Sequence, residues 1–339
     1  MESDGAQPSF SRVPVFECGP KWCIKDQMRD MDQRLFGSPG SVIGIAFRHW
    51  EEITCPLCQV PPRPFARDYQ GFQLSRCPAC HLEFLNPRPT FEELSDHVYN
   101  QTYFSEPAPV TPLTREQFYQ FRRQIDTAYR LLGADNKERK TLLDVGCGDG
   151  SFLRDAKECG WTVAGCDIGL TAAAREVGCP VWEGQLKGID FGGLRFDVVR
   201  FNHVLEHTQN PLPELQRSRE LLHPGGILYV SVPNLAGVSA KIKNLQSLFH
   251  LKRHRWRHYA ALHHLWFFTP RTLRRLLEHS GFRVVYWETP VLKKPDQNSS
   301  LEIAYRFLLE KSMAASILDY YGTPAERPLS ALKQAESKP

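Results

Sequence analysis

The feature that most constrains this chain is a glycine-rich turn at residues 141–153, TLLDVGCGDGSFL. Before the turn, Leu142 to Val145 is typical of the buried end of a strand, and residues 151–158 are typical of the first turns of a helix. Glycine has no Cβ, so a ligand can approach the backbone here. The helix directs its free N–H groups at that ligand and favours an anionic group. The glycines form a G-x-G-x-G turn and are Gly146, Gly148 and Gly150.

A carboxylate follows the next apolar run. Residues 163–166 (VAGC) are typical of a short strand that ends in Asp167, 17 positions after Gly150. A carboxylate at a strand tip can accept hydrogen bonds from both ribose hydroxyls. The dinucleotide fingerprint shares this acid, but its glycines follow G-x-G-x-x-G, whereas the sixth position here is Ser151. The tighter spacing favours a ligand with a carboxylate and a nucleoside over a pyrophosphate. A turn without a ligand is the alternative that the acid and the glycines disfavour.

Further along the chain, strand-like and helix-like segments alternate. This alternation predicts an α/β domain with a doubly wound, mostly parallel sheet. Ligands of such sheets bind at the carboxyl ends of the strands, where the residues singled out here lie. The predicted strands are 141–145, 162–166, 180–182, 197–201, 226–232 and 283–288, and the predicted helices are 151–159, 170–177, 211–222 and 270–280.

The order and spacing of these motifs resemble class I S-adenosylmethionine-dependent methyltransferases. The resemblance covers about residues 141–290, and the chain is most similar to a bacterial branch with a small cysteine-ligated zinc module before the methyltransferase domain. It implies a Rossmann-like fold and methyl transfer to a small-molecule acceptor. The segments that carry it are LLDVGCGDGSFL (142–153), Asp167, FDVVRFNHVLEH (196–207), LLHPGGILYVSVPN (221–234) and HLWFFT (264–269).

The resemblance implies S-adenosylmethionine as the cofactor, with Asp167 on the ribose and Gln185 on the adenine amine. Asp144 and Asn202 would help to fix the amino end of the cofactor. Tyr103 lies in a segment that similar enzymes fold over the cofactor as an aromatic lid, although ordinary packing is an alternative for it. The remaining implied cofactor contacts are Gly146, Gly148, Gly150, Ile168, Leu186 and Phe201.

Three histidines are candidate catalytic groups. His203 and His207 are four residues apart, so they would share one face of a helical turn near the sulfonium. This spacing is also that of a metal pair, but the local sequence offers no third ligand. For His207, a histidine bonded to the backbone at a helix end is an alternative of equal weight. His264 matches a histidine that similar enzymes turn toward the substrate and is the first candidate for a base or an orienting group. A base is needed only if the acceptor is a weakly acidic hydroxyl or carbon.

Two C-x-x-C pairs precede the methyltransferase segment, with 18 residues between them. Such pairs form tight turns whose sulfurs converge, and this spacing predicts a four-thiolate zinc ribbon. The zinc would be structural, because four thiolates leave no open coordination position. Reduced surface cysteines, a redox pair and substitution by His81 are less favoured alternatives. The four predicted ligands are Cys55, Cys58, Cys77 and Cys80.

A basic insertion at residues 235–262 separates the fifth predicted strand from His264. Its position predicts a lid over the substrate pocket, which would receive an anionic small molecule such as a phosphorylated or nucleotide-linked one. A solvated charged face and a peripheral membrane contact are the alternatives. The first half has one apolar face formed by Val238, Ile242, Leu245 and Leu248. The basic residues are Lys241, Lys243, Lys252, Arg253, Arg255 and Arg257.

The chain of 339 residues is long enough for one α/β domain and a smaller module. Residues 301–321 are typical of a helix, so we expect the last antiparallel strand of the family's sheet to be missing or replaced. There is no apolar run that could span a bilayer and no signal peptide, and the cysteine pattern fits a metal site; together these favour the cytoplasm. The predicted divisions are a poorly patterned segment 1–50, a zinc ribbon 51–90, a helical lid or linker 91–134, the methyltransferase domain 135–290, and a C-terminal helix with a disordered tail 291–339.

The sequence therefore predicts a methyltransferase that uses S-adenosylmethionine, carries a structural zinc ion and acts on a small molecule. A net charge of +4 over this length does not indicate a polyanionic partner. The fourth strand ends in Phe-Asn-His and lacks the Pro-Pro turn with which DNA amino-methyltransferases hold a flipped base, so nucleic acid is disfavoured. The alternatives are a protein or RNA methyltransferase and a non-catalytic scaffold. Nothing in the sequence indicates the oligomeric state.

Overall fold

The computed structural model describes residues 47–99, 115–133, 138, 140–291, 308–309 and 311–325. These residues all belong to one compact unit, Phe47–Pro339. Within the part of the chain that is described, no helix is long and apolar enough to cross a membrane. Most of the predicted segment 1–50, Tyr103 and the tail beyond residue 325 lie outside the described residues.

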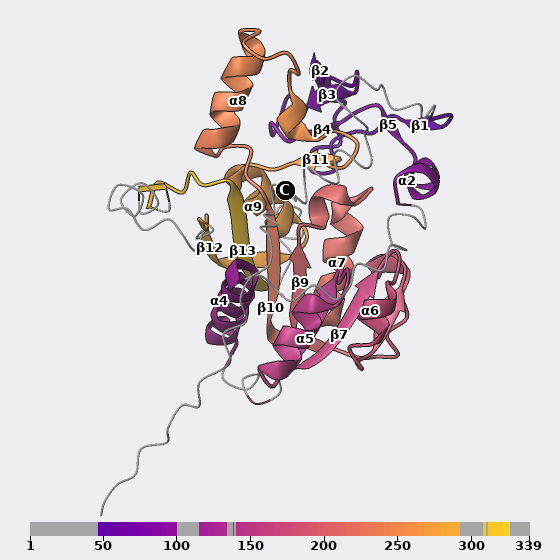
Figure 1. Cartoon of the computed structure of the whole chain (residues 1–339), viewed down its shortest axis with the longest axis vertical. Coiled ribbons are helices and arrows are strands. Elements are labelled where there is room, and N and C mark those ends of the chain that lie inside the picture. The colour runs from indigo at the N-terminus through magenta and orange to yellow at the C-terminus, as the bar shows by residue number, and fades with distance from the viewer. Residues whose placement is uncertain are drawn as a thin grey trace, which may run out of the picture. The chain divides into compact units, whose positions relative to one another are not determined.

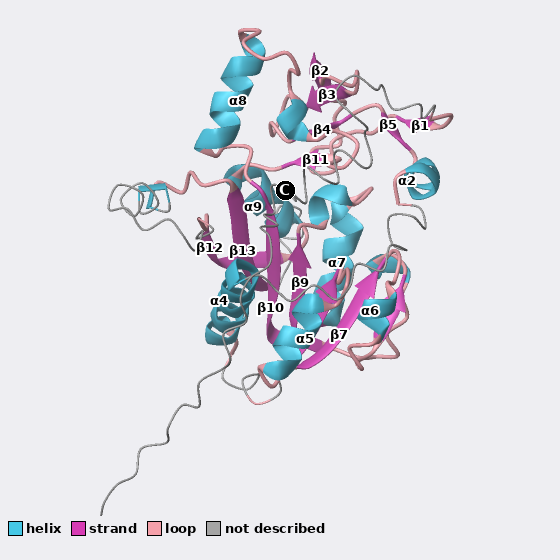
Figure 2. Cartoon of the chain, in the orientation of Figure 1, coloured by secondary structure: helices cyan, strands magenta, loops and turns pink. Residues whose placement is uncertain are grey.

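A mixed sheet of seven strands forms the centre of the methyltransferase segment, in the order β12-β13-β10-β9-β6-β7-β8 (Figures 1 and 2). Neighbouring strands from β10 to β8 run parallel, and β13 runs antiparallel to both β10 and β12. The prediction of an α/β fold with a mostly parallel sheet is therefore confirmed. The strands are β6 (Thr141–Val145), β7 (Thr162–Asp167), β8 (Val181–Glu183), β9 (Phe196–Asn202), β10 (Leu222–Pro233), β12 (Phe282–Glu288) and β13 (Ile317–Pro324).

The expected loss of the last antiparallel strand is wrong. Residues 317–321, which the sequence assigned to a helix, belong to β13 and pair with β10 from Leu228 opposite Gly322 to Pro233 opposite Ile317. The strand was missed because Asp319 interrupts its apolar pattern. That carboxylate is fully buried and accepts hydrogen bonds from the Ser231 hydroxyl at 2.7 Å and from Arg123 at 3.0 Å. These bonds allow the carboxylate to be buried within a central strand.

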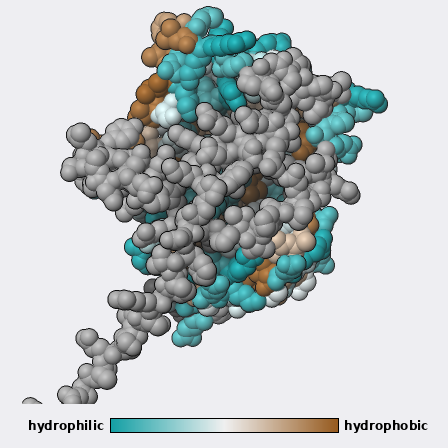
Figure 3. Space-filling view, in the orientation of Figure 1, coloured by the Kyte–Doolittle hydropathy of each residue, from teal (hydrophilic) through white to brown (hydrophobic). Residues whose placement is uncertain are grey.

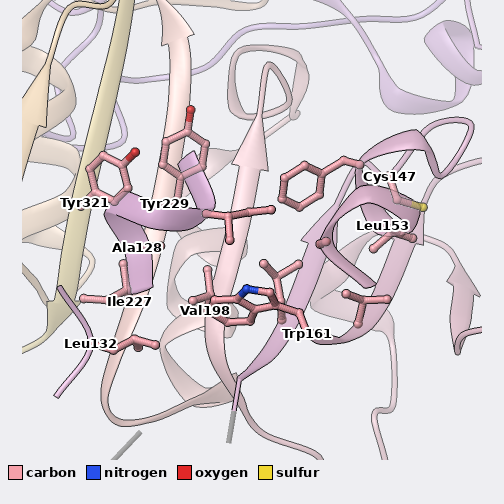
Figure 4. Packing of buried hydrophobic residues seen from close by; sticks show 14 of the residues in the cluster. Ala128, Leu132, Cys147, Leu153, Trp161, Val198, Ile227, Tyr229 and Tyr321 are labelled. Atoms are coloured by element: carbon pink, nitrogen blue, oxygen red, sulfur yellow. The ribbon is translucent and has the colours of Figure 1, made fainter. Parts of the chain in front are cut away.

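Helices pack along the sheet and supply the main core. The core joins apolar residues of α4 and α5 to one face of β6, β9 and β10, with Tyr229 and Tyr321 at its edge (Figure 4). α7 packs against β9 and β10, and α9 against β12. Predicted helices occur at all four places, although the second is only one turn long. The helices are α2 (Phe91–His97), α4 (Arg115–Leu131), α5 (Ser151–Glu158), α6 (Ala172–Arg175), α7 (Pro211–Leu221), α8 (Val238–Leu248) and α9 (Pro270–His279).

A second sheet belongs to the cysteine-containing segment, but its fourth strand comes from elsewhere. β2 (Arg63–Arg67), β3 (Gln73–Arg76) and β4 (Glu83–Leu85) form an antiparallel meander, and β11 (Trp266–Phe267) pairs with β4. A separate antiparallel pair joins β1 (Trp50–Glu51) to β5 (Arg88–Pro89). The strand that follows the basic insertion thus completes the sheet of the N-terminal module, so the two segments are built together.

A buried ion pair crosses the centre of the large sheet. Arg200 of β9 donates to the Asp144 carboxylate of β6 at 2.6 Å, and both side chains are almost fully buried. The guanidinium also donates two hydrogen bonds to Gln124 of α4 and stacks over the Phe152 ring at 3.6 Å. Burial raises the pKa of Asp144 to about 6, although the Arg200 charge acts in the opposite direction. The carboxylate therefore depends on its cation.

We predict that Arg200→Met lowers the free energy of unfolding by about 3–5 kcal/mol, because it leaves a buried carboxylate without its cation. The matched control is Arg175→Met, which breaks an exposed pair with Glu183 and should cost less than about 1 kcal/mol. Urea unfolding followed by circular dichroism measures both. Adding Asp144→Asn to Arg200→Met should restore part of the loss. Equal losses in the two single variants would contradict the assignment.

Candidate functional site

The glycine turn lies between β6 and α5 and uses backbone angles that favour glycine. Gly146, Gly148 and Gly150 have φ values of 72°, 57° and 75°. The Gly146 N–H donates to the Cys166 carbonyl at 2.7 Å, which fixes the turn to the end of β7. The turn is therefore held at the carboxyl end of the parallel strands, the edge at which such sheets bind ligands.

The three glycines have different surroundings. A Cβ on Gly146 would lie 2.3 Å from Val204 Cγ2, and one on Gly150 would lie 2.6 Å from Val177 Cγ2. A Cβ on Gly148 would meet no described atom within 4 Å. The outer glycines are required by packing, whereas Gly148 faces open space at the middle of the turn. This is the position at which a ligand could contact the backbone.

Asp167 closes the turn from the side of β7. Its carboxylate accepts a hydrogen bond from the Gly148 N–H at 2.9 Å and a longer one from the Gly169 N–H at 3.4 Å. Burial raises the pKa of Asp167, and the hydrogen bonds to Gly148 and Gly169 oppose that rise. Ile168 follows with 37% of its surface exposed. The predicted acid and the predicted turn are thus in direct contact.

The other predicted cofactor residues differ in burial and in their hydrogen bonds. Phe201 and Leu186 are fully buried, Gln185 begins the short helix η2 (Leu186–Gly188) after β8, and Asn202 ends β9. The Asn202 side chain accepts a hydrogen bond from Gln124 at 3.2 Å. The Asp144 carboxylate is engaged by Arg200 inside the protein. Arg200 and Gln124 were missed by the sequence analysis, because their contact joins a strand to a helix 76 positions earlier and leaves no spacing signal.

The three predicted histidines gather around one buried carboxylate. Glu206 lies in the short helix η3 (Leu205–His207) and is 0% exposed. Its Oε1 is 3.2 Å from His203 Nδ1 and 3.9 Å from His207 Nε2, and its Oε2 has no hydrogen-bond partner among the described residues. The rings of His207 and His264 lie edge to face, with centroids 4.9 Å apart. The structure therefore brings residues 203–207 together with residue 264.

The charges of this group follow from its burial. Burial would raise the pKa of Glu206, but the hydrogen bond from His203 and the neighbouring histidine charges lower it to about 2. Burial lowers the pKa of His264 to about 3, with help from the His207 charge, so His264 is neutral at physiological pH. For His203, burial would lower the pKa, yet its bond to Glu206 gives a net rise. The site thus holds one negative carboxylate beside one neutral imidazole.

The hydrogen bonds of His207 fix its tautomer. His207 Nδ1 lies 2.6 Å from the His263 carbonyl oxygen. A carbonyl can only accept, so Nδ1 carries the hydrogen, and in the neutral form of the ring the lone pair is on Nε2. The alternative of a backbone-bonded histidine is therefore correct for Nδ1 and leaves Nε2 able to accept a proton. Glu206, His207 and His264 also offer donor atoms within 4.8 Å of one another, the spacing of a metal-binding set. This set shares only His207 with the His203 and His207 pair considered from the sequence, and its His264 comes from 57 residues away.

The four cysteines of the C-x-x-C pairs converge in the N-terminal module. Their sulfurs lie within 4.8 Å of one another, and Cys55 Sγ is 3.5 Å from Cys80 Sγ. The Cys80 N–H points at Cys77 Sγ at 3.4 Å, a contact that would stabilise a thiolate. Hydrogen bonding from Cys55 lowers the pKa of Cys80 to about 5, and burial raises that of Cys58 to about 11. The donor set and its spacing fit a tetrahedral four-thiolate metal site.

The module reaches the histidine group through backbone hydrogen bonds. The Leu85 N–H of β4 donates to the Leu265 carbonyl at 2.9 Å, and the Leu265 N–H donates to the Glu206 carbonyl at 2.8 Å. From the basic insertion, the Tyr259 hydroxyl donates to Glu83 of β4 at 2.7 Å. The position of His264 is therefore tied to the sheet of the cysteine module.

Comparison with known proteins gives a family for the central segment. Residues 115–286 match the family described as Methyltransferase domain. The ubiquinone biosynthesis O-methyltransferase of Dinoroseobacter shibae is 27% identical over 248 residues, which cover 68% of this chain and 89% of that protein. The enzyme of the same name from Cereibacter sphaeroides is 29% identical over 174 residues, or 48% of this chain and 63% of the relative.

Solved structures show the same type of match at lower identity. A 1,6-didemethyltoxoflavin-N1-methyltransferase from Burkholderia thailandensis, solved with its substrate and S-adenosylhomocysteine, is 17% identical with a TM-score of 0.44. The match covers 78% of this chain and 100% of that chain. An S-adenosylmethionine-dependent methyltransferase from Archaeoglobus fulgidus is 21% identical with a TM-score of 0.41, over 61% of this chain and 92% of the other.

Proposed function

The chain belongs to the Methyltransferase domain family and is an S-adenosylmethionine-dependent methyltransferase, and we propose that it methylates an oxygen atom of a small-molecule acceptor. The observation that carries the proposal is the contact between the open Gly148 and the Asp167 carboxylate at the carboxyl end of the sheet. The choice of oxygen is supported by the relatives, which are named O-methyltransferases, and by the lone pair on His207.

In this proposal the turn and Asp167 hold the cofactor. Asp167 accepts hydrogen bonds from the ribose hydroxyls, and the space over Gly148 leaves room for the methionine portion. Gln185 and Ile168 border the adenine, while Asn202 lies toward the amino end; Asp144 acts through Arg200 and β6, since its carboxylate is already engaged. The bound cofactor supplies an activated methyl group, so these residues have to align the acceptor and exclude water.

The histidine group supplies the proton chemistry. His207 Nε2 would accept the proton of an acceptor hydroxyl as the oxygen attacks the methyl group. The nearby Glu206 carboxylate, held negative, would stabilise the resulting imidazolium, and the His263 carbonyl keeps the ring in the required tautomer. His264, neutral and packed edge to face on His207, would orient the acceptor. His203 positions Glu206 through their hydrogen bond.

We further propose that the four cysteines bind one structural zinc ion. Three of the cysteines are buried, and the intervening β-meander has a small core of its own, which favours metal-supported folding. The anionic character of the acceptor and the cytoplasmic location stay predictions. The segment divisions also stay predictions, with the qualification that β11 joins the ribbon sheet from outside residues 51–90.

The cofactor assignment predicts that Asp167→Asn weakens binding of S-adenosylmethionine by about 10- to 100-fold, because the carboxylate no longer accepts two charge-assisted hydrogen bonds. Calorimetric titration measures the dissociation constant. Asp190→Asn is the control, since the exposed Asp190 carboxylate accepts only a local hydrogen bond from the Gly192 N–H among the bonds described and its change should leave binding unchanged. Titration with NAD should give no heat. Unchanged affinity in Asp167→Asn would contradict the role of this residue, and no binding to the native protein would contradict the function.

The proposed base predicts that His207→Gln lowers kcat by about 100-fold or more while binding of S-adenosylmethionine is retained, because proton transfer contributes that much to such reactions. The measurement is methyl transfer from labelled cofactor to a panel of phenols and catechols. His250→Gln is the control, because that side chain is exposed in the insertion. Loss of activity with a chelator under conditions that leave the zinc content of the cysteine module unchanged, with recovery on adding a divalent ion, would show that Glu206, His207 and His264 act as metal ligands instead.

The zinc proposal predicts about one zinc per chain in protein purified without chelator, and a lower melting temperature together with metal loss in Cys77→Ser. Metal analysis by mass spectrometry and thermal unfolding are the measurements. Cys159→Ser alters a half-buried thiol outside the cluster and should retain the metal. Native protein without bound metal, or Cys77→Ser with an unchanged metal content and melting temperature, would refute the site.

A further inference from the structure

Exposed apolar side chains are concentrated in one short stretch of the basic insertion. The described residues include thirteen large exposed hydrophobic side chains, and six of them lie between residues 238 and 251. Their exposed fractions range from 36% to 72%. We call these six residues the apolar stripe: Val238, Ile242, Leu245, Leu248, Phe249 and Leu251. Figure 3 shows hydrophobic surface at the upper left, where Figure 1 places α8.

The stripe follows the helical period, but it faces away from the protein. Val238, Ile242 and Leu245 are four and three residues apart and share one side of α8, which Leu248 and Phe249 extend. A surface helix normally turns such a face toward the core. Here the predicted apolar face of the insertion is present and exposed, so packing among the described residues does not account for it.

The polar side of α8 is the side that anchors it. The buried Ser247 accepts hydrogen bonds from the Trp256 N–H at 3.0 Å and, through its carbonyl, from Arg255 at 2.9 Å. Asn244 Oδ1 lies 2.6 Å from His258 Nε2. At its start, the Val238 N–H donates to the Ala314 carbonyl at 2.9 Å. These contacts fix the helix with the apolar stripe outward, so its exposure follows from a defined orientation.

The charge of the insertion is uniform in sign. Residues 235–262 contain six Lys and Arg residues and no Asp or Glu, which gives +6 against +4 for the whole chain, so all other residues sum to −2 (4 − 6). Lys241 on α8 and Arg253 just beyond it are exposed beside the apolar stripe. A surface that combines a strong positive charge with an apolar ridge is complementary to anionic lipid headgroups over acyl chains.

We propose that the apolar stripe and the flanking basic residues dock this protein on the surface of an anionic phospholipid bilayer. The apolar side chains insert between the headgroups, and the basic side chains contact the lipid phosphates. A second copy of the chain is a poorer occupant, because each insertion would bring +6 to the same interface. Nucleic acid is also a poorer occupant, because it would leave the six exposed apolar side chains without a partner.

Docking in this way has a consequence for the acceptor. α8 begins five residues after β10 ends at Pro233, and β10 ends at the edge of the sheet that carries the cofactor turn. A bilayer bound to α8 therefore lies on the side of the molecule from which an acceptor enters. This consequence, an amphiphilic acceptor taken from the lipid surface, rests on the proposed function, whereas the docking itself does not.

Vesicle flotation with the full chain tests the docking. We expect recovery with vesicles of phosphatidylcholine and phosphatidylglycerol, and at least about tenfold weaker binding to phosphatidylcholine alone. Leu245→Gln with Leu248→Gln should reduce binding to the anionic vesicles by about tenfold or more. The matched control, Leu194→Gln, changes a similarly exposed leucine elsewhere and should bind as the native chain does.

The charge contribution is tested separately. Lys241→Gln with Arg253→Gln should lower binding to anionic vesicles about tenfold and reduce its salt dependence, whereas Arg271→Gln, an exposed arginine on α9, should have little effect. Calorimetric binding of S-adenosylmethionine and an unchanged melting temperature show that each variant is folded. Vesicle binding needs no catalysis, so its failure is distinguishable from failure of the methyltransferase assignment.

Three outcomes would overturn the proposal. The first is no recovery of the native chain with anionic vesicles. The second is a concentration-dependent dimer in sedimentation velocity that the Leu245→Gln and Leu248→Gln changes abolish, which would assign the apolar stripe to a second copy. The third is an RNA mobility shift at physiological salt that survives those two changes and is lost with Lys241→Gln and Arg253→Gln.

Discussion

The backbone of Leu265 joins the two halves of this molecule. Its carbonyl accepts a hydrogen bond from β4 of the cysteine module, and its N–H donates to the carbonyl of Glu206 in the histidine group. Because β11 follows immediately and pairs with β4, the segment that carries His264 is held as part of the ribbon sheet. A metal that orders the cysteine module would therefore also order the segment that carries His264, without taking part in the methyl transfer.

Buried charge is the second constraint, and in each case the protein supplies the partner. Arg200 neutralises Asp144 beneath the cofactor turn, Arg123 and Ser231 satisfy Asp319 in β13, and His203 contacts Glu206. Unpaired, each of these groups would be costly in a core of this kind. The contacts of Arg200 and Arg123 cross between strands or between a helix and a strand, so they constrain the packing of these elements, whereas the contact of His203 with Glu206 is local. One oxygen of these three carboxylates, Glu206 Oε2, has no hydrogen-bond partner within the described residues and belongs to the residue beside the proposed base.

The sequence was sufficient where local chemistry determines structure. The sequence predicted the glycine turn from the φ angles that glycine allows, and the parallel strands and Asp167 from short apolar runs. It predicted the cysteine cluster from the C-x-x-C spacing, which brings the sulfurs of each pair together. The sequence was insufficient where the burial of a residue depends on a partner that is distant in the sequence. Strand β13 was missed because burial of Asp319 in it requires hydrogen bonds from Ser231 and Arg123, which the sequence does not reveal. The contact between His207 and His264 joins residues 57 positions apart, which no sequence periodicity connects. α8 was predicted as an apolar face, but its outward orientation depends on the bonds of Ser247 and Asn244.

The exposed apolar stripe and the half-buried histidine group can both serve the entry of one acceptor. The proposed base packs against the neutral His264, and such a site suits an acceptor that has an apolar body and a hydroxyl. An acceptor of that type partitions into lipid. An enzyme that bound it only from aqueous solution would not need six exposed apolar side chains beside a cluster of cations. The insertion, which the sequence predicted as a lid, is then better described as a membrane-contact surface. It holds the carboxyl edge of the sheet close to the bilayer in which the acceptor is concentrated.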